Sequence, residues 1–596
     1  MKSPIRFFVA AALAAGTAPV LSACGDDAPT IARFTVQVYG PDDDRAAQDP
    51  IFGFPAGVQS QITDVRVTAF QGLQRIASEE FDYEGDNDGF NGTLPAVPFG
   101  ENNWLAVEAL NNNGDVLASG ASQRFDLVDE ASLAGLSVRV HTALPDRFTT
   151  AFRFDNDDSV RASVSAPFEL GVGRVGFASA ELPDGRIVMI GGADLDFGAD
   201  GVSFAAYYDT VEVYEPTTGT WFTVTTPGCS IADLGIEGCA VRLTQPRAFH
   251  TATVLDDGSV AIVGGIAEDP DFGNPVTVSI NSAIEVLEFT GQLEGTVTPS
   301  SATTGNASRA LHTATKMSDG RVVFVGGITG SWDNPTYLSD IDEMTGGGND
   351  FSYGTTGVFL GQPRALHTAV YFDEQEQGIV LAGGRGTDNV VGGSEVVYLD
   401  GGAIGVDAFA AVGGSVDMAQ PRFGHSAVPY GCPGSTRRYM AVAGGWTSVT
   451  GPAPLAGATT TPLVEVYDPS GFNSSSVYTF LPDPAFQMTA GRAFATLVAL
   501  PALGDLLVAG GINGGGDIVE TAERFVNIEV SNCGSFTRGG AVDRTTVADG
   551  LVEARAMAHG YALPSQFAFV FGGTNGSNAL RSSEFYNTND YRFIDP

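Results

Sequence analysis

Positive charge is scarce in this chain of 596 residues. Lysine and arginine together number 30 against 70 aspartates and glutamates, which gives a formal net charge of −40 at pH 7. Only two of the basic residues, Lys2 and Lys316, are lysines. A surface of this charge repels phosphate backbones, so the composition excludes nucleic acid as a partner and favours cationic partners or divalent cations.

Long apolar runs are also missing, apart from a short one at the amino terminus. Residues 7–15 are apolar and follow Lys2 and Arg6, but they are too few to span a bilayer. A short apolar stretch behind positive charge is typical of a secretory signal peptide. The next residues, LSAC at 21–24, resemble the bacterial lipobox, whose cysteine is acylated and becomes the first residue of the mature protein.

The lipobox resemblance implies a signal peptide over residues 1–23 and a lipid-anchored tether over 24–30. Acyl chains on Cys24 would hold the protein at the bacterial cell envelope, and we expect the outer membrane. The sequence does not distinguish the periplasmic face of that membrane from the cell-surface face. The alternative is an ordinary signal peptide followed by a chance cysteine.

Cysteine is rare, with five residues in the chain. Four remain after Cys24, and an exported chain with an even number of cysteines is expected to form disulfides. Cys229 and Cys239 lie ten positions apart in one loop, so we predict that they pair. A second disulfide between Cys432 and Cys533 is left open. No CxxC or Cys/His spacing typical of a metal site is present.

Known catalytic and metal-binding motifs are absent as well. The sequence has no GxSxG, HExxH, Walker A or sialidase-type Asp box. Residues 84–89 imitate the start of an EF-hand loop, but Pro95 stands where the bidentate glutamate is required. Asp194, Asp196 and Asp200 are weak candidates for a calcium site, with solvated acidic turns as the alternative. No cofactor and no metal are predicted.

What the chain has in abundance is glycine, 76 residues, and a repeat built on it. A pair of glycines ends a short apolar run seven times, as in RIVMIGG and SVAIVGG, at intervals of about 57 to 73 residues. The pairs are Gly191-Gly192, Gly264-Gly265, Gly326-Gly327, Gly383-Gly384, Gly444-Gly445, Gly510-Gly511 and Gly572-Gly573. A repeat of this kind predicts identical structural units packed side by side.

Each unit reads as four antiparallel strands. An arginine opens the unit, an apolar β-prone run follows, and Asp-Gly often precedes the next run, which predicts a hairpin that ends at the glycine pair. A third strand carries a recurring glutamate, as in TVEVYEP around Glu212, and a fourth is clearest at residues 221–224. Four antiparallel strands per unit are typical of a propeller blade.

Together the doubled glycine, the V-E-V-Y-[DE]-P strand and the aromatic at Trp221 resemble the kelch repeat over residues 170–596. The resemblance implies an all-β fold with a seven-bladed kelch-type β-propeller. Two features depart from the family. The spacing between units is longer than the kelch period of about 50 residues, and the fourth-strand aromatic is hard to find after the first unit. Kelch propellers include copper-radical sugar oxidases, which take ligands from a further carboxy-terminal domain, and sugar mutarotases.

Residues 31–148 do not carry the repeat. Short runs that alternate apolar and polar residues, separated by turn residues, predict a small β-sandwich there. The run at 92–120 loosely resembles Ig-like or transthyretin-like modules of bacterial surface proteins. Residues 149–169 are interpreted as the linker to the propeller.

Two sets of repeated polar residues are interpreted as structural. Four histidines share one position of the unit, and we expect them to make hydrogen bonds between blades while the backbone edge of the inner strand lines the central channel. The repeated arginine and glutamate are expected to pair with each other, because buried charges require partners. The histidines are His250, His312, His367 and His425.

The long loops after the glycine pairs, over residues 193–208, 266–281, 328–337 and 446–462, are expected on one end of the propeller. They are rich in aromatics and form the candidate binding face, with Trp332 and Trp446 foremost; the alternative is that the rings only fix their own loops. Further members are Phe197, Tyr207, Tyr208, Phe272 and Tyr337. We therefore predict a lipid-anchored scaffold that binds a protein or a glycan, with a carbohydrate-active propeller enzyme as the alternative.

Overall fold

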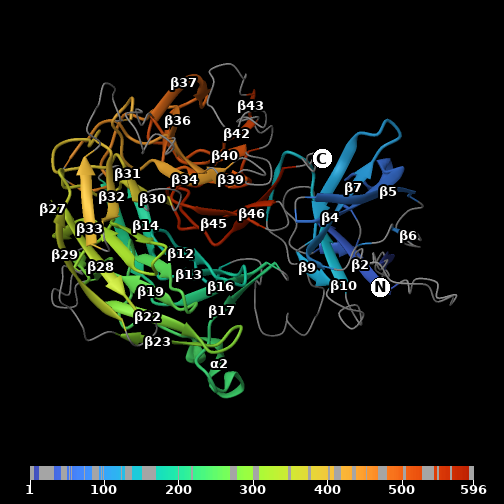
Figure 1. The fold of residues 1–596 in the computed structure, drawn as a ribbon, viewed down its shortest axis with the longest axis horizontal. Coiled ribbons are helices and arrows are strands. Elements are labelled where there is room, and N and C mark those ends of the chain that lie inside the picture. Colours follow the sequence, from blue (N-terminus) through green and yellow to red (C-terminus); the bar gives the residue numbers. More distant parts are fainter. Residues whose placement is uncertain are drawn as a thin grey trace, which may run out of the picture.

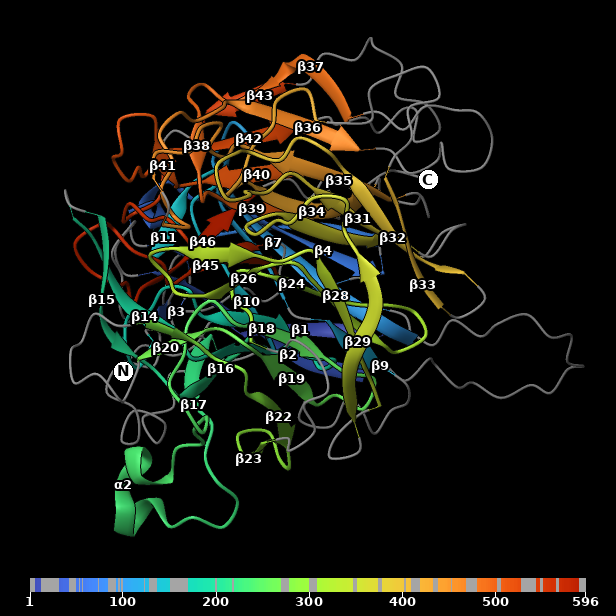
Figure 2. The same ribbon diagram turned by 90° about the vertical axis from the view of Figure 1, so that its left-hand side faces the viewer.

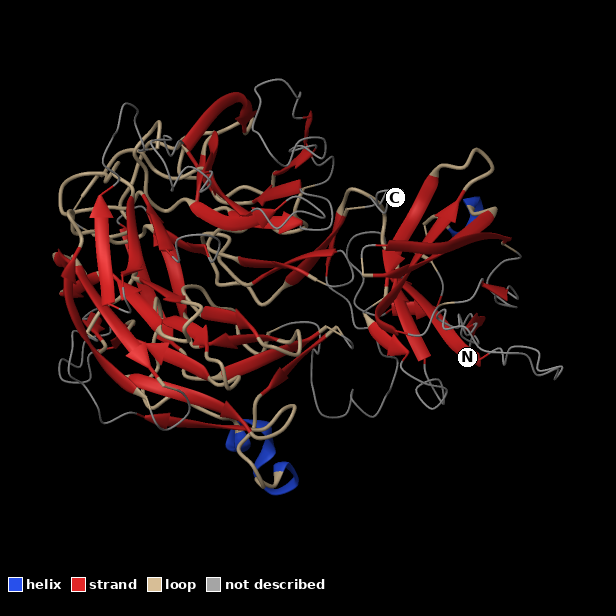
Figure 3. Cartoon of the chain, viewed as in Figure 1, coloured by secondary structure: helices blue, strands red, loops and turns tan. Residues whose placement is uncertain are grey.

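A computed structural model of the full chain describes residues 6–588 with gaps. The larger gaps are 12–31, 42–49, 84–92, 128–136, 151–169, 269–277, 300–307, 347–350, 373–377, 409–417, 432–437, 468–479, 501–504, 527–542, 547–549 and 564–566, and the remaining gaps span one or two residues. The regular secondary structure of the described residues is almost entirely β-strand, joined by loops and turns (Figure 3). It forms a large ring of sheets and a smaller domain beside it (Figure 1).

Seven four-stranded antiparallel sheets follow one another along the described part of the chain, and we number them as blades 1 to 7. In each blade the strand that follows the arginine is innermost, and the innermost strands of successive blades contact one another. The predicted all-β propeller is thus confirmed. From inside outwards, blades 1 to 3 are β12 (Ala178–Glu181), β13 (Ile187–Ile190), β16 (Val211–Glu215) and β17 (Thr220–Thr223); β18 (Thr251–Val254), β19 (Val260–Val263), β22 (Ile284–Phe289) and β23 (Gly295–Pro299); β24 (Thr313–Lys316), β25 (Val322–Val325), β28 (Asp340–Thr345) and β29 (Ser352–Phe359).

The later blades repeat the same order. Blades 4 to 7 are β30 (Thr368–Phe372), β31 (Gly378–Ala382), β32 (Glu395–Asp400) and β33 (Ala403–Ala408); β34 (Ser426–Gly431), β35 (Arg438–Ala443), β36 (Leu463–Tyr467) and β37 (Phe480–Gln487); β39 (Thr496–Leu500), β40 (Asp505–Ala509), β42 (Ala522–Val526) and β43 (Asp543–Thr546); β44 (His559–Ala562), β45 (Phe567–Phe571), β46 (Ser583–Asn587) and β11 (Phe148–Thr150). Figure 2 shows the blades from the side that lies farthest from the smaller domain.

The outermost strand of blade 7 comes from the other end of the sequence. β11 pairs antiparallel with β46, with Phe148 opposite Tyr586 and Thr150 opposite Glu584. The segment 149–169, interpreted from the sequence as a linker, therefore begins inside the propeller. Three residues from the amino-terminal side complete the last blade, because the repeat itself supplies only three strands there.

The doubled glycines join neighbouring blades. A Cβ on Gly191 would lie 2.7 Å from the carbonyl oxygen of Arg247 in the next blade, and the glycine backbone has φ +60°, so other residues are excluded here by contact and by conformation. The N–H of the second glycine donates to the same arginine carbonyl. These bonds, 2.8 to 3.1 Å long, run from Gly192 to Arg247, Gly265 to Arg309, Gly327 to Arg364, Gly384 to Arg422, Gly445 to Arg492, Gly511 to Arg555 and Gly573 to Arg174. The last bond joins blade 7 to blade 1 and closes the ring.

Four two-stranded sheets extend the loops at one end of the ring. They follow the glycine pairs or pair with the segment that opens a blade. They are β14 (Ala193–Gly198) with β15 (Gly201–Tyr207), β20 (Ile266–Glu268) with β21 (Val278–Ile280), β26 (Ile328–Gly330) with β27 (Pro335–Tyr337), and β38 (Arg492–Ala493) with β41 (Ile512–Asn513).

The smaller domain is a sandwich of two sheets whose facing residues share one core. Val36 and Val140 of one sheet are fully buried together with Val65 and Val107 of the other. One sheet has the order β10 (Ser137–His141), β2 (Ala32–Pro41), β1 (Arg6–Ala11), β6 (Thr93–Leu94), with β3 (Pro50–Phe52) also on β2; the other has β5 (Gln74–Asp82), β4 (Asp64–Gln71), β7 (Gly100–Leu110), β8 (Val116–Ala121), with β9 (Phe125–Leu127) on β7. A 3-10 turn, η1, spans Gln59–Gln61.

Strand β1 lies within the segment predicted to be the signal peptide. It pairs antiparallel with β2, with Arg6 opposite Gln37. Cleavage before Cys24 would remove this strand and expose the edge of β2, so the uncleaved chain and the predicted mature chain differ in one sheet. The cleavage itself stays a prediction. No helix among the described residues has the length and apolar character needed to cross a bilayer.

The sandwich lies beside the propeller (Figure 1), and polar side chains connect the two. The Asn587 side chain, at the end of β46, donates to the backbone oxygens of Ser119 and Ala143 at 3.0 and 2.9 Å. Asp146, just before β11, pairs with Arg524 of blade 6 at 3.0 Å. These contacts lie next to β11 (Phe148–Thr150), the strand from the amino-terminal side that completes blade 7, and we call it the clasp strand. Polar contacts to the sandwich and to blade 6 therefore support its position.

Candidate functional site: the axial channel

The channel along the propeller axis is shaped by an unusual backbone position. The second residue after each opening arginine has a φ between 51° and 63°, a region that residues other than glycine rarely adopt. The seven residues are Gly176, Phe249, Leu311, Leu366, Gly424, Phe494 and Met557. Backbone hydrogen bonds link six successive pairs of them around the axis, for example from the N–H of Phe249 to Gly176 at 2.6 Å and from Met557 to Phe494 at 3.0 Å.

All of these residues except Gly424 line a cavity of about 490 Å³ on the axis and form its floor. The expectation that only backbone edges line the channel is wrong, because the left-handed backbone turns five apolar side chains into it. Above this floor the wall consists of Phe177 and of small and polar side chains at the start of the inner strands. The wall includes Ala178, Ser179, His250, Thr251, Ala252, His312, Ala314, Ser426, Ala427, Ala495, Ala558 and His559.

Aromatic side chains close the axis on the other side of this floor. The Trp332 ring stacks on Phe249 with centroids 5.7 Å apart, and Phe204 meets Trp332 edge to face at 5.3 Å. Trp446 meets Phe494 edge to face at 4.9 Å. The loops that carry these rings fold inward and form an aromatic cap. The cap and the cavity lie on opposite sides of the floor. The cavity therefore opens toward the turns between the first and second strands of the blades.

This arrangement corrects the expected binding face. Trp332, Tyr337 and Trp446 are only 5%, 6% and 4% exposed, because they pack in the cores around the floor rather than project into solvent. Tyr207 and Tyr208 are half-buried. The side chain of Phe197 and the whole of Phe272 lie outside the described residues. The alternative interpretation, that the rings fix their own loops, therefore fits the structure better.

Arg385, the residue after the fourth glycine pair, fixes the cap. Its side chain is fully buried, and its guanidinium donates to carbonyl oxygens of the 446–462 loop, among them Pro454 at 2.9 Å and Ala456 at 3.1 Å. The guanidinium also lies over the Phe423 ring, 5.6 Å from its centroid. The cap is thus a built part of the fold.

Three of the four repeated histidines make hydrogen bonds between blades, as predicted, whereas both ring nitrogens of His250 are buried without a side-chain partner among the described residues. In three successive seams a threonine of one blade contacts Nε2 of the next histidine: Thr251 to His312 at 3.0 Å, Thr313 to His367 at 3.0 Å and Thr368 to His425 at 2.9 Å. Burial lowers the pKa of His425 to about 3 and of His250 to about 3, and it lowers the pKa of His312 and His367 well below the usual value. These imidazoles are therefore neutral at pH 7.

Neutral buried histidines predict a loss of stability in mild acid. In the unfolded chain a histidine binds its proton near pH 6.5, whereas in the folded chain His250 and His425 resist protonation until about pH 3, so each of these two costs stability as the pH falls below 6.5. Between pH 7 and pH 5 we expect each histidine to contribute a loss of up to about 2 kcal/mol. The urea unfolding free energy of His425→Gln should depend less steeply on pH than that of wild type. Equal slopes for the two proteins would contradict this.

The repeated arginines pair with carboxylates of the third strand in the same blade, as predicted. The Nη1 of each arginine also donates to the carbonyl of the first glycine of its pair, at 2.8 to 3.3 Å. The pairs are Arg174–Glu212, Arg247–Glu285, Arg309–Asp342, Arg364–Glu395, Arg422–Glu465, Arg492–Glu523 and Arg555–Glu584. The sequence reading missed Asp342, whose shorter side chain also accepts from the Tyr353 hydroxyl at 2.9 Å.

The seam between blades 7 and 1 departs from this regular pattern. His559 stands where blades 2 to 4 have a threonine, and its Nδ1 lies 2.5 Å from the hydroxyl of Ser179. The same hydroxyl lies 2.8 Å from the Tyr561 hydroxyl. Burial lowers the pKa of His559 to about 4 and raises the pKa of Tyr561 to about 12, so both groups are uncharged at pH 7. Sequence reading missed this cluster, although a comparison of the seven units at this one position would have marked His559 as the exception.

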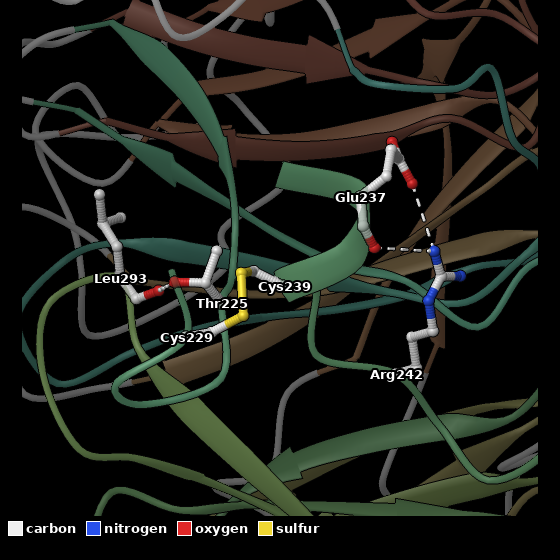
Figure 4. Close-up of a disulfide and its surroundings, with 6 residues drawn as sticks. All are labelled: Thr225, Cys229, Glu237, Cys239, Arg242 and Leu293. Atoms are coloured by element: carbon white, nitrogen blue, oxygen red, sulfur yellow. Dashed lines mark hydrogen bonds and ion pairs between the residues drawn. A yellow bond between two sulfur atoms is a disulfide. The ribbon is translucent and has the colours of Figure 1, made fainter. Parts of the chain in front are cut away.

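Other predicted site residues lie elsewhere. Cys229 and Cys239 form a disulfide that bounds the projecting helix α2 (Ile231–Cys239), and Arg242 reaches Glu237 on that helix (Figure 4). This loop lies far from the axis, at the outer end of blade 1 (Figure 2).

The remaining predicted sites are largely untested. Cys24, Cys432 and Cys533 fall outside the described residues. Of the calcium candidates, Asp194 and Asp196 lie in β14, while Asp200 falls outside the described residues. No group of three or more metal-binding side chains occurs within the described parts of the chain.

Comparisons with known proteins give structural likeness only. No protein family and no curated protein matches the sequence. Among solved structures, YjhT is 12% identical with a TM-score of 0.39, over 63% of this chain and 99% of that chain. A fungal alcohol oxidase of the AA5 family in complex with copper is 12% identical with a TM-score of 0.46, over 70% of this chain and 75% of that chain. Neither likeness carries an argument about activity, and the propeller assignment rests on the strand pairing described above.

Proposed function

We propose that this chain is a lipid-anchored protein of the bacterial cell envelope, whose propeller binds part of a protein or a glycan in its axial cavity. The observation that carries the proposal is the cavity itself. Its volume of about 490 Å³ lies in the range of small-molecule sites. It has a rigid apolar floor, a wall with a few polar groups, and a single side closed by the cap.

The nature of the wall favours binding over catalysis. The described residues that line the cavity include no aspartate, glutamate, lysine or arginine. Enzymes that act on glycosidic bonds usually place a pair of carboxylates beside the substrate. The seam between blades 7 and 1 nevertheless favours a second candidate, a carbohydrate-active enzyme, because the hydroxyls of Ser179 and Tyr561 and the His559 ring could pass a proton between them.

Binding is tested with the soluble chain from residue 25 onward on a glycan array and, in parallel, by pulldown from envelope extract. We expect retention of one glycan class or one envelope protein, with bound glycans recovered chemically unchanged. Conversion of a bound sugar would instead support the enzyme. Failure to retain any glycan or envelope protein would contradict the binding role.

Anchoring is tested separately at Cys24. The lipobox resemblance predicts that Cys24→Ser yields an unacylated protein that leaves the membrane fraction or fails to mature, because stable anchoring requires the acyl chains. The measurement is mass spectrometry of the mature amino terminus in wild type and variant. An unmodified wild-type terminus at any other residue would reject the anchor.

A further inference from the structure

The seams on either side of blade 1 differ from the others in the polar groups they present to the channel. At two seams the hydroxyl donates to a backbone carbonyl, Ser426 to Ala495 and Thr496 to Ala558, and at three it contacts a histidine. Each of these five hydroxyls has a partner in the next blade. Blade 1 has Ala178 at the same position, so no hydroxyl faces His250 across that seam.

On the other side of blade 1, the Ser179 cluster has unused hydrogen-bonding capacity. The Ser179 hydroxyl has one donor and two acceptor sites, and its two protein contacts do not fill them. The His559 ring is fixed by Phe177, with centroids 4.4 Å apart, and uses Nδ1 for Ser179. Its Nε2 has no protein partner among the described residues, and His559 lines the cavity. Both side chains therefore present hydrogen-bonding atoms to the channel.

We propose that this sector of the channel, formed by Ser179 and His559 with His250 beside them and Tyr561 hydrogen-bonded to Ser179, is the recognition site for an uncharged sugar residue. The inference rests on the proposed binding function and names its ligand class and site.

The charge of the site selects against ionic ligands. Both histidines are neutral at pH 7, and no charged side chain lines the cavity among the described residues, so neither an anion nor a cation would find a counter-charge there. The net charge of −40 further disfavours anions. Neutral hydroxyl, imidazole and phenol groups both donate and accept, as sugar hydroxyls do.

The floor supplies the apolar half of such a site. Phe249 and Phe494 lie at the base of the cavity together with Leu311, Leu366 and Met557. Aromatic faces pack well against the C–H faces of sugar rings, while the polar sector on one wall would fix which hydroxyls are read. A polar wall beside an apolar floor matches the two-sided character of a pyranose.

The experiment is saturation-transfer NMR of the chain from residue 25 onward with pairs of sugars that differ in charge. The uncharged sugars are glucose, galactose and N-acetylglucosamine, and glucuronate and galacturonate are the carboxylate counterparts of the first two. We expect at least one uncharged sugar to bind, and glucose or galactose to bind at least about tenfold more tightly than its own uronate, since the carboxylate enters a site without a counter-charge. Lactose and cellobiose distinguish sources: binding of the disaccharide indicates the end of a glycan, and binding of the monosaccharide alone indicates a free sugar.

Variants locate the site. Ser179→Ala and His559→Gln should each weaken binding by about three- to tenfold, because each removes or displaces one hydrogen bond. Thr313→Ala makes a comparable change at a seam outside the cavity wall and should leave affinity unchanged. Melting temperatures of all variants control for folding.

Three outcomes overturn the inference: no uncharged sugar binds, the uronates bind equally well, or both variants bind like wild type. The last would leave the binding function intact and move the site elsewhere. A chain that binds sugar through Ser179 yet retains nothing from the array or the envelope would instead reject the scaffold role and keep the site.

Discussion

Phe148→Ala will destabilise the propeller by about 3–5 kcal/mol, although Phe148 lies outside every repeat unit. Its side chain is fully buried in a core shared by blades 6 and 7, against residues such as Leu507 and Val570. Truncation leaves a cavity in that core and weakens the strand that completes blade 7. Equilibrium urea unfolding followed by tryptophan fluorescence measures the loss.

The control for this prediction is Phe359→Ala, since Phe359 is 57% exposed at the end of an outer strand of blade 3. We expect it to change the unfolding free energy by less than about 0.5 kcal/mol. Deleting residues 1–150 removes the clasp entirely and exposes the edge of β46, so that chain should aggregate rather than fold. A soluble deletion variant that melts like wild type would show that blade 7 does not need β11 as its fourth strand.

The repeat could be predicted from the sequence because its physical requirements recur seven times. A buried arginine requires a carboxylate, and a glycine pair beside a neighbouring carbonyl tolerates no side chain. Both requirements appear in the sequence as the same residue types, arginine and a glycine pair, in every unit. Asp342 was missed because it fills the same role with a different residue and a shorter side chain, helped by Tyr353.

The clasp and the cap could not be predicted in the same way. β11 is three residues long and pairs with a strand more than 400 positions away, so no local pattern marks it. Trp332 and Trp446 lie in loops that the sequence presents as surface. Their burial follows from the inward course of those loops and from Arg385, whose fixing hydrogen bonds go to backbone carbonyls that carry no sequence signal.

The axial site could be predicted only by comparing units for their differences. The repeat fixes the position of the channel wall, and the exceptions at Ala178 and His559 show where the wall is polar and incompletely satisfied. The left-handed floor residues have no common side chain, since phenylalanine, leucine, methionine and glycine all occupy the position. Their shared conformation follows from the ring of backbone bonds, not from their residue types.

The second large effect is expected at the buried ion pair of blade 5. Arg422 and Glu465 are both fully buried, and Glu465 also accepts from the Ala419 N–H at 2.7 Å. Arg422→Met leaves that carboxylate without its counter-charge and frees the carbonyls of Gly444 and Leu463, which accept from Arg422 at 3.2 and 2.9 Å. We expect a loss of about 3–5 kcal/mol.

A double-mutant cycle separates the charge from the packing. Arg422→Met with Glu465→Met removes both charges, so its cost should fall short of the sum of the two single costs by about 1–3 kcal/mol. The double variant will still be less stable than wild type, because the backbone groups that hydrogen-bonded to Arg422 and Glu465 lose their partners. Arg242→Ala is the control: Arg242 is 43% exposed in its ion pairs with Asp209 and Glu237, so its loss should stay below about 1 kcal/mol. If the losses of unfolding free energy in the single variants add up to the loss in the double variant, the charge of Arg422 does not stabilise the blade and only its packing does.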